Sequence, residues 1–599
     1  MRHSTARSGR AAQPSHAKRT TATPCPAVLA LLATAWAPLA GLAQTPEPAA
    51  LPPPADLVIL NGRVWTGVPD AKEEQSIAVS GDRVAAVGSN GDIQARVGPG
   101  TQVIDAQGRR VIPGITDSHT HFLEGGLGLF RLDLRPARSR AEFRDLVAGA
   151  VARMAPGAWL LGGQWTVDSW DNPEPPHREW IDDLTPGNPV FLDRMDGHQA
   201  LVNSVALKYA RIDRDGPPDP PGGEIVRNPA TGEPTGILKD EAMALVAGKI
   251  PPPSEAEYGQ ALAAAMRHAN SFGITGIHDM SAPPHLPVLA KFHKAGTLTV
   301  RIVAYLSVDD WTANVETARG FHPADEWLRV VGFKGFMDGS LGSRTAYMRE
   351  PYSDATPDAR YPRGMLMATA DPPEKLGRHV RAAAAAGFQP TVHAIGDEAN
   401  RLLLDLYEAL PEAARVRVRP RIEHAQHLRP QDVPRFGKLG VVASMQPFHK
   451  ADDGRYAERA LGKERCATSY AFRSLVDSGA LVCFGSDWPV VTLSPFAGMA
   501  AAVGAFTLDD RIWFPQQSLS PEEALRAYTV NPAVAARRDK ELGTLEPGKL
   551  ADIAILLDDP LHTTPKAMLD IRATHTIVGG RLVWQLPLSA GAGPSDPRE

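Results

Sequence analysis

The amino-acid sequence predicts an α/β fold, a (β/α)8 TIM barrel joined to a small β-sandwich domain built from both chain ends. Eight apolar runs of strand length lie in the middle of the chain, helical stretches rich in Ala and Leu separate several of them, and alternating strand patterns lie at both ends. Strand–helix alternation repeated eight times favours a closed parallel barrel, whose active site lies at the carboxyl ends of its strands. The eight expected strands are 111–115, 276–279, 301–307, 332–336, 389–393, 421–424, 441–445 and 481–485.

The two ends of the chain carry similar strand patterns. Short alternating apolar runs begin at Asp56 and return from Asp552, so we expect both ends to join in one small domain. The expected domains are a composite β-sandwich of residues 56–112 and 541–586, a barrel of residues 113–540, and within it an insertion at about residues 123–260. The insertion holds several tryptophans and is expected to cover the active site as a cap. They are Trp159, Trp165, Trp170 and Trp180.

The N-terminal residues 1–43 have the order of a secretory signal peptide. A basic stretch without acids precedes an apolar run and then small residues that end at Ala43. The apolar run is shorter than the ~20 residues that a spanning helix needs, which disfavours a membrane anchor; a disordered tail is the other alternative. We expect cleavage after Ala43, a proline-rich linker at 44–55, and export to the periplasm with no membrane contact after the signal is removed.

Composition excludes several classes of protein. The 599 residues are 43% hydrophobic and 22% charged with a net charge of −5, which is ordinary for a globular enzyme. Basic residues are not concentrated in the expected folded region, so a nucleic-acid partner has no electrostatic support. Three cysteines, of which Cys25 lies in the signal, exclude a disulfide scaffold. We expect a small-molecule substrate, and the oligomeric state, a homo-oligomer included, stays open.

The first chemical signal is the pair His119 and His121, which directly follows the first expected strand. Residues two apart in a strand point the same way, so both imidazoles can reach one ion. Imidazole suits zinc and similar divalent metals. Such a pair taken alone is as well explained by surface histidines, and its position at a strand end is what favours a metal site.

Three further side chains end other expected strands of the same barrel. His393 and His424 close neighbouring strands, and Asp487 follows the last strand, which lies beside the first when the barrel closes. Each has a structural alternative: a hydrogen-bonded histidine, or a helix cap for the aspartate. Together with the histidine pair they indicate a metal centre, in which Asp487 both binds metal and accepts a proton from bound water.

Seven motifs in order resemble the amidohydrolase superfamily, and more narrowly its amidohydrolase-3 subgroup, which includes N-substituted formamide deformylases. The resemblance runs from about Asp56 to Gln585. The motifs are PGITDSHTH (113–121), DGHQALVNS (196–204), FKGFMDGSLGSRTA (333–346), VHAIGDEAN (392–400), IEHAQ (422–426), FGSDWPV (484–490) and GTLEPGKLAD (543–552).

The resemblance implies a role for each matching residue. It gives His119, His121 and Asp487 to a more buried metal ion and His393 and His424 to a second one. The implied metal ligands are His119, His121, Lys334, His393, His424 and Asp487.

Two of the implied roles have structural alternatives. Lys334 would be carbamylated by CO2 and bridge both ions; an ordinary strand-end lysine is the alternative. His198 would reach the substrate as a catalytic residue; a structural histidine is the alternative. His278, Asp279 and Asp338 are candidates for supporting the ligands.

The implied function is hydrolysis of a non-peptide C–N bond, an amide or N-substituted formamide, by a metal-activated hydroxide with one or two divalent ions, most simply zinc. Ester or lactone hydrolysis on the same centre is one alternative, and a non-catalytic periplasmic binding protein is another. Arg344 either binds a substrate carboxylate or pairs with a loop acid. Substrate specificity lies in barrel loops, which have no readable code.

Overall fold

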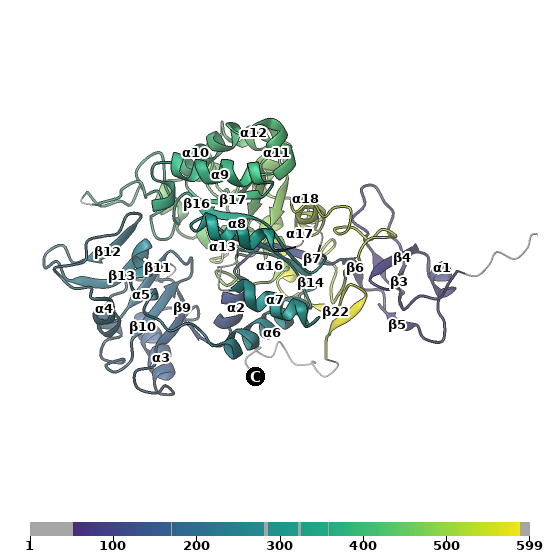
Figure 1. The fold of residues 1–599 in the computed structure, drawn as a ribbon, viewed down its shortest axis with the longest axis horizontal. Helices are drawn as coiled ribbons and strands as arrows, with labels where there is room; N and C mark the ends of the chain where they lie inside the picture. Colours follow the sequence, from purple (N-terminus) through teal and green to yellow (C-terminus); the bar gives the residue numbers. More distant parts are fainter. Residues whose placement is uncertain (1–51, 169, 281–284, 322–324, 358, 588–599) are drawn as a thin grey trace, which may run out of the picture. The chain divides into compact units, whose positions relative to one another are not determined.

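The computed structural model describes residues 52–168, 170–280, 285–321, 325–357 and 359–587 (Figure 1). The expected signal peptide and residues 44–51 of the linker lie outside the described residues. Within those described ranges, no helix is both long enough and apolar enough to cross a bilayer. Cys466 and Cys483 are both buried free thiols.

Eight parallel strands form one sheet in the order β20-β19-β18-β17-β16-β15-β14-β7. The sheet closes where Thr120, the last residue of the first strand, bridges Trp488 in parallel register beyond the end of the last strand. The (β/α)8 barrel expected from the sequence is therefore confirmed. Its strands are β7 (Ile115–Thr120), β14 (Ile274–Asp279), β15 (Arg301–Ser307), β16 (Leu328–Phe336), β17 (Gln389–Ala394), β18 (Arg421–His424), β19 (Val442–Met445) and β20 (Val482–Phe484).

Two of the helices between the strands, α9 and α6, show how the sequence defines them. In α9 (Glu374–Ala386) the buried residues recur at helical spacing, and the helix ends at Gly387, whose φ of 85° only glycine adopts readily. A capping box of Ser254 and Glu257 begins α6. The other helices that follow barrel strands include α7 (Leu286–Lys294), α8 (Trp311–Arg319), α10 (Asp397–Glu408), α12 (Val433–Leu439) and α16 (Pro495–Gly504), and α6 spans Glu255–Ser271.

The first barrel strand lies further along the chain than expected, so the prediction that residues 111–115 form the first strand of the barrel was wrong. β6 (Arg110–Pro113) belongs to the small domain and pairs with β21 (Ile553–Leu556), whereas β7 pairs with β14. The chain changes sheets at Gly114, where a Cβ atom would lie 2.1 Å from the Thr275 hydroxyl. One continuous apolar run thus serves two strands, and periodicity alone does not divide it.

The small domain consists of two sheets. One contains β1 (Leu57–Leu60), β3 (Ser76–Ser80), β4 (Arg83–Gly88) and β5 (Gln102–Asp105), all from the N-terminal side. The other has the order β2-β6-β21-β22-β23, in which β2 is Arg63–Val64, β22 is Ala573–Val578 and β23 is Arg581–Gln585. This second sheet combines strands from both chain ends. Buried side chains from both sheets, such as Ile59, Ile77, Ile553 and Ile577, form one core.

The insertion forms a six-stranded sheet of its own, with the order β12-β13-β11-β10-β9-β8 (Figure 1). Trp165, Trp170 and Trp180 pack in its core with exposed fractions of 6% or less, and Trp159 packs against Tyr209. The tryptophans therefore hold the insertion together. Its strands are β8 (Leu132–Asp133), β9 (Leu160–Trp165), β10 (Val190–Arg194), β11 (Gln199–Val202), β12 (Gly223–Arg227) and β13 (Pro234–Asp240).

A buried ion pair joins the small domain to the barrel. Arg301 on β15 donates two hydrogen bonds to Asp552, at 2.8 and 3.0 Å, and the side chains are only 2% and 4% exposed. The amide of Gly579 donates to the same carboxylate at 2.9 Å. A buried charge that loses its partner stays desolvated without compensation, which is costly.

We predict that Asp552→Ala lowers the free energy of unfolding by about 3–5 kcal/mol, because the Arg301 guanidinium then stays buried without its partner. Urea denaturation followed by circular dichroism measures the change. Glu316→Ala is the matched control: its pair with Arg319 is more than half exposed on both sides, so it should cost less than about 1 kcal/mol. Equal losses in the two variants would contradict the prediction.

Candidate metal centre

A cavity of about 320 Å³ lies at the carboxyl ends of the barrel strands. Both barrel and insertion residues line it, which agrees with the expectation that the insertion covers the active site. The histidine and acid–base side chains in its wall include His121, His198, Lys334, His393, His424, His449 and Asp487.

The closure of the barrel brings the first and last strands together at the histidine pair. The amide of Asp487 donates to the His119 carbonyl at 2.7 Å, and the amide of His121 donates to the Trp488 carbonyl at 2.8 Å. Gly485 allows the two strand ends to approach this closely, because a Cβ atom at this position would lie 2.5 Å from the His119 amide nitrogen. The aspartate is thereby fixed beside both histidines.

His119, His121 and Asp487 form one group of donor atoms that fits a metal ion. Asp487 Oδ1 lies 3.3 Å from His119 Nε2 and 3.4 Å from His121 Nε2, and all three donor atoms lie within 4.8 Å of one another. Burial alone would raise the pKa of Asp487, but His119 and His121 hold that pKa well below its usual value. The carboxylate is therefore ionised and ready to ligate.

A second group consists of His424, His449 and Asp487, again with donor atoms within 4.8 Å of one another. His424 Nδ1 and His449 Nε2 are buried and have no hydrogen-bond partner among the described residues; the same holds for Asp487 Oδ1, the oxygen that faces the first group. Buried polar atoms are nearly always paired, because leaving them unpaired costs free energy. A cation bound by these lone pairs would satisfy them, so the donor set fits a divalent metal.

His393 lies beside this second group but belongs to neither set of three. Its ring centroid is 4.4 Å from that of His424, and its Nε2 donates to the Gly339 carbonyl at 3.0 Å. Burial and the nearby His198 hold the pKa of His393 well below its ordinary value, so the ring is neutral. Nδ1 is therefore its available donor atom.

Lys334 points into the cavity from β16. Its Nζ lies 3.5 Å from His119 Nε2 and 4.5 Å from the centre of the Phe336 ring. Burial lowers the pKa of this lysine to about 8, in spite of Glu423 and Asp487 nearby. Lys334, which lies beside the histidine donors, therefore loses its ammonium proton more readily than an ordinary lysine.

Two residues that were not among the expected site residues, Glu423 and Arg421, fix the orientation of the His119 ring. The Nδ1–H of His119 donates to Glu423 Oε2 at 2.6 Å, and Arg421 Nε donates to Glu423 Oε1 at 2.8 Å, with all three side chains fully buried. Burial and Lys334 keep the pKa of His119 well below its usual value. The proton on Nδ1 leaves the Nε2 lone pair facing the cavity side, where a metal ligand is needed.

The sequence carries a signal for this pair. Arg421 and Glu423 are two apart in β18, so both point into the barrel, where charged side chains are unusual. Arg421 also donates to His278 Nδ1 and to the Tyr305 hydroxyl, each at 2.9 Å. The expected supporting role of His278 is therefore exerted through Arg421.

The other expected supporting residues hold the backbone around the site. Asp338 accepts from the amides of Ile395 and Gly396, at 3.0 and 2.8 Å, and Asp279 accepts from the amide of Phe122 at 2.9 Å. Burial raises the pKa of each of these carboxyl groups to about 7.

Arg344 pairs with Asp354, 2.6 Å away on a loop. Of its two alternatives, the structure shows the loop ion pair.

His198 reaches the cavity from the turn between β10 and β11 of the insertion. Its Nδ1 lies 2.6 Å from Asp240 Oδ1, and its ring centroid is 5.1 Å from that of His393. Burial alone would lower the pKa of His198, but the hydrogen bond to Asp240 raises it. Because Asp240 holds Nδ1, Nε2 is the nitrogen left for a ligand in the cavity.

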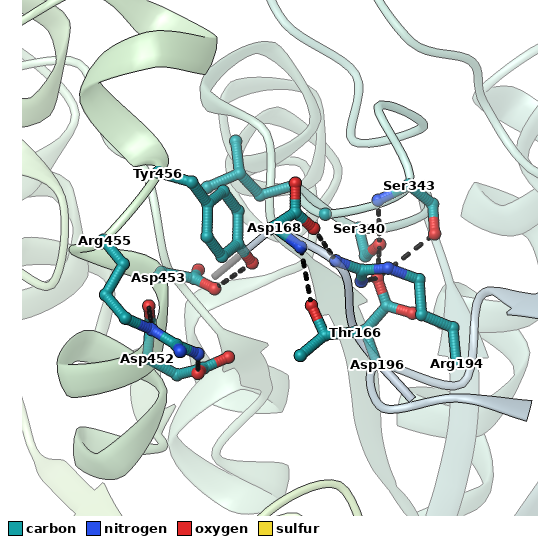
Figure 2. A network of polar contacts seen from close by, with 12 residues as sticks. Thr166, Asp168, Arg194, Asp196, Ser340, Ser343, Asp452, Asp453, Arg455 and Tyr456 are labelled. Atoms are coloured by element: carbon teal, nitrogen blue, oxygen red, sulfur yellow. Dashed lines mark hydrogen bonds and ion pairs between the residues drawn. The ribbon is translucent and has the colours of Figure 1, made fainter. Parts of the chain in front are cut away.

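A polar network ties the insertion to the barrel loops beside His198 (Figure 2). Arg194 of β10 pairs with Asp168 and Asp196, and Asp196 accepts hydrogen bonds from Ser340 and Ser343 of the loop that follows β16. Arg194 packs so closely on this loop that a Cβ at Gly342 would lie 2.1 Å from its Nη1. These contacts fix the position of the insertion relative to the candidate metal centre.

We predict that Glu423→Gln weakens metal binding by about 10–100-fold, because the partner that fixes the His119 tautomer loses its charge. Competition with a fluorescent chelator measures the dissociation constant. Tyr305→Phe is the control, since its hydroxyl contacts Arg421 but neither Glu423 nor His119. Unchanged affinity in a folded Glu423→Gln protein would contradict the role given to this carboxylate.

Comparison with known proteins places the chain in a family. Residues 102–584 match the model of the amidohydrolase family. Protein LONG AFTER FAR-RED 3 of Arabidopsis thaliana is 37% identical over 580 residues, which cover 93% of this chain and 97% of that protein. Putative amidohydrolase YtcJ of Bacillus subtilis is 30% identical over 88% of this chain and 98% of its own length.

Solved structures agree with this placement. An uncharacterized metal-dependent hydrolase from Pyrococcus furiosus matches 84% of this chain and 99% of its own, with a TM-score of 0.65 and 28% identity. A second one, from Pyrococcus horikoshii OT3, has a TM-score of 0.68 and 26% identity over 85% of this chain and 99% of its own. The chain belongs to the amidohydrolase family, and its fold and donor groups are those of a metal-dependent hydrolase.

Proposed function

We propose that the protein hydrolyses a non-peptide C–N bond, that of an amide such as an N-substituted formamide. The observation that carries the proposal is the convergence of His119, His121 and Asp487 at the mouth of the barrel, beside buried donor atoms that have no hydrogen-bond partner in the described part of the chain. The substrate class is supported by a relative, the N-substituted formamide deformylase of Arthrobacter pascens, which is 27% identical over 88% of this chain and 98% of its own.

Zinc is the ion that we propose for this donor set of imidazoles and a carboxylate. His119, His121 and Asp487 would hold one ion, with His424 and His393 beside a second position. When bound, such an ion lowers the pKa of a coordinated water and polarises an acyl carbonyl.

The chain's own residues then position the substrate and move the proton. Asp487, ionised and next to both histidines, accepts the proton of the attacking water and delivers it to the leaving amine. His198 faces the acyl group from the insertion, with Asp240 holding its ring so that Nε2 donates to or accepts from the substrate.

We predict that Asp487→Asn retains most of the bound metal but lowers kcat by about 10²–10⁴-fold, because the amide cannot accept a proton. Metal content is measured by elemental analysis, and turnover on a panel of N-acyl amines, N-substituted formamides, esters and lactones. Arg344→Lys serves as the control, since that side chain pairs with Asp354 on a loop.

The panel also separates the alternatives. Turnover of esters or lactones alone would replace the amide assignment, and metal without any turnover would favour a binding protein. Full activity in Asp487→Asn would contradict the role proposed for this carboxylate.

Lys334 is proposed to react with CO2. The ammonium first gives one proton to solvent, and the neutral Nζ then forms the N–C bond to CO2 as one C=O π bond breaks and a second proton leaves to solvent. The product is a carbamate anion whose two oxygens can ligate cations; an ammonium 3.5 Å from His119 Nε2 would instead repel them.

We predict a carbamate resonance in the ¹³C NMR spectrum of the folded metal-loaded protein under ¹³CO2, and its loss in Lys334→Ala. Lys450→Met is a matched control. Lys450 is also buried, and burial lowers its pKa to about 8, but it lies outside the cavity wall, so its replacement should leave the resonance in place. A resonance that survives in Lys334→Ala would exclude this lysine as its source.

A further inference from the structure

We infer that His449 is a ligand of the second metal position, which it forms together with His424 and the second carboxylate oxygen of Asp487. The inference rests on the proposed function and deepens it, because the ligand set implied by the sequence takes no residue from the seventh barrel strand.

The topology places His449 at the metal centre. Strand β19 lies between β18, which ends at His424, and β20, which leads to Asp487. Helix α13 (Pro447–Asp453) begins two residues after β19 ends, so its first turn lies at the carboxyl end of the barrel. His449 lies in this first turn and lines the cavity.

The donor atoms are arranged as a site. The atoms that His424, His449 and Asp487 offer lie within 4.8 Å of one another. The rings of His424 and His449 are nearly parallel, with an interplanar angle of 12° and centroids 6.3 Å apart. Two imidazoles and one carboxylate are the protein ligands of many catalytic zinc sites, which keep a further position open.

Asp487 faces both groups with different oxygens. Oδ1 lies 3.3 and 3.4 Å from the Nε2 atoms of His119 and His121, whereas Oδ2 lies 4.0 Å from His424 Nδ1. One carboxylate thus has an oxygen directed at each group of histidines. This arrangement points to two ion positions that share Asp487.

The hydrogen bonding of His449 differs from that of a structural histidine. Its Nε2 is buried and without a hydrogen-bond partner among the described residues, as is His424 Nδ1. A nearby structural histidine shows the contrast: His427 contacts the Ser469 hydroxyl at 2.7 Å through Nδ1 and the Gln426 amide at 3.2 Å through Nε2. A cation bound between His449 Nε2 and His424 Nδ1 would explain why neither nitrogen has a hydrogen-bond partner among the described residues.

The inference is tested by metal stoichiometry and affinity, which do not depend on turnover. We expect the unmodified full-length protein to bind two zinc ions per chain. In His449→Gln one of the two ions should be lost, because the affinity of the second position falls at least about 100-fold. This loss is larger than is typical for residues that only support a ligand. His268→Gln is the control: its ring packs on Phe272 and Trp488, outside the cavity wall, and both ions should remain.

A His119→Ala variant separates this inference from the proposed function. If His119→Ala keeps all its metal, the metal centre itself is wrong and the proposed function fails. If His119→Ala loses metal while His449→Gln binds both ions with wild-type affinity, only the role of His449 is overturned.

A second measurement covers the case in which His449→Gln does not fold. An anomalous difference map of crystals of the unmodified zinc-loaded protein should place an ion at ligand distance, about 2.0–2.1 Å, from an imidazole nitrogen of His449. An ion bound elsewhere, with none at His449, would overturn the inference.

Discussion

The metal centre depends on one contact, the closure of the barrel between β7 and the segment that follows β20. The two backbone hydrogen bonds that join His119 to Asp487 and His121 to Trp488 set the distance between the carboxylate and both imidazoles. Asp117 strengthens the same junction from the side, since its carboxylate accepts from the amides of His119 and Ser486 at 3.0 Å. Without this junction the donor atoms of the first group would come from unconnected strand ends.

Buried charge supports the centre at two levels. Inside the barrel, Arg421 contacts both carboxylate oxygens of Glu423, and Oε2 is shared with the Nδ1–H of His119. At the insertion, Arg194 pairs with two aspartates, which neutralise its charge. It therefore links the insertion to the barrel loops and does not provide an anion-binding site in the cavity. Buried pairs of this kind contribute little net stability, and their value lies in the geometry they impose.

The sequence predicted the barrel because strand–helix alternation is a strong and repeated signal, and it predicted the first donor group because His119, His121 and Asp487 lie at or shortly after the carboxyl ends of barrel strands. It misplaced the first strand, since the apolar run around Gly114 continues across the junction of two sheets. It did not identify Glu423, whose partner is 304 residues away. His449 gave no strand-end signal because it lies on a helix, and only the folded chain shows its neighbours.

The junction between β7 and the end of β20 also has a consequence for biosynthesis. The Asp117 carboxylate and the Ser486 amide that it binds are 369 residues apart in the sequence. A growing polypeptide that leaves the ribosome from its N-terminus therefore carries two of the three members of the first donor group long before the third is made. A divalent ion offered to the nascent chain would meet two imidazoles without their carboxylate, so tight binding at this group would have to wait until translation has nearly ended.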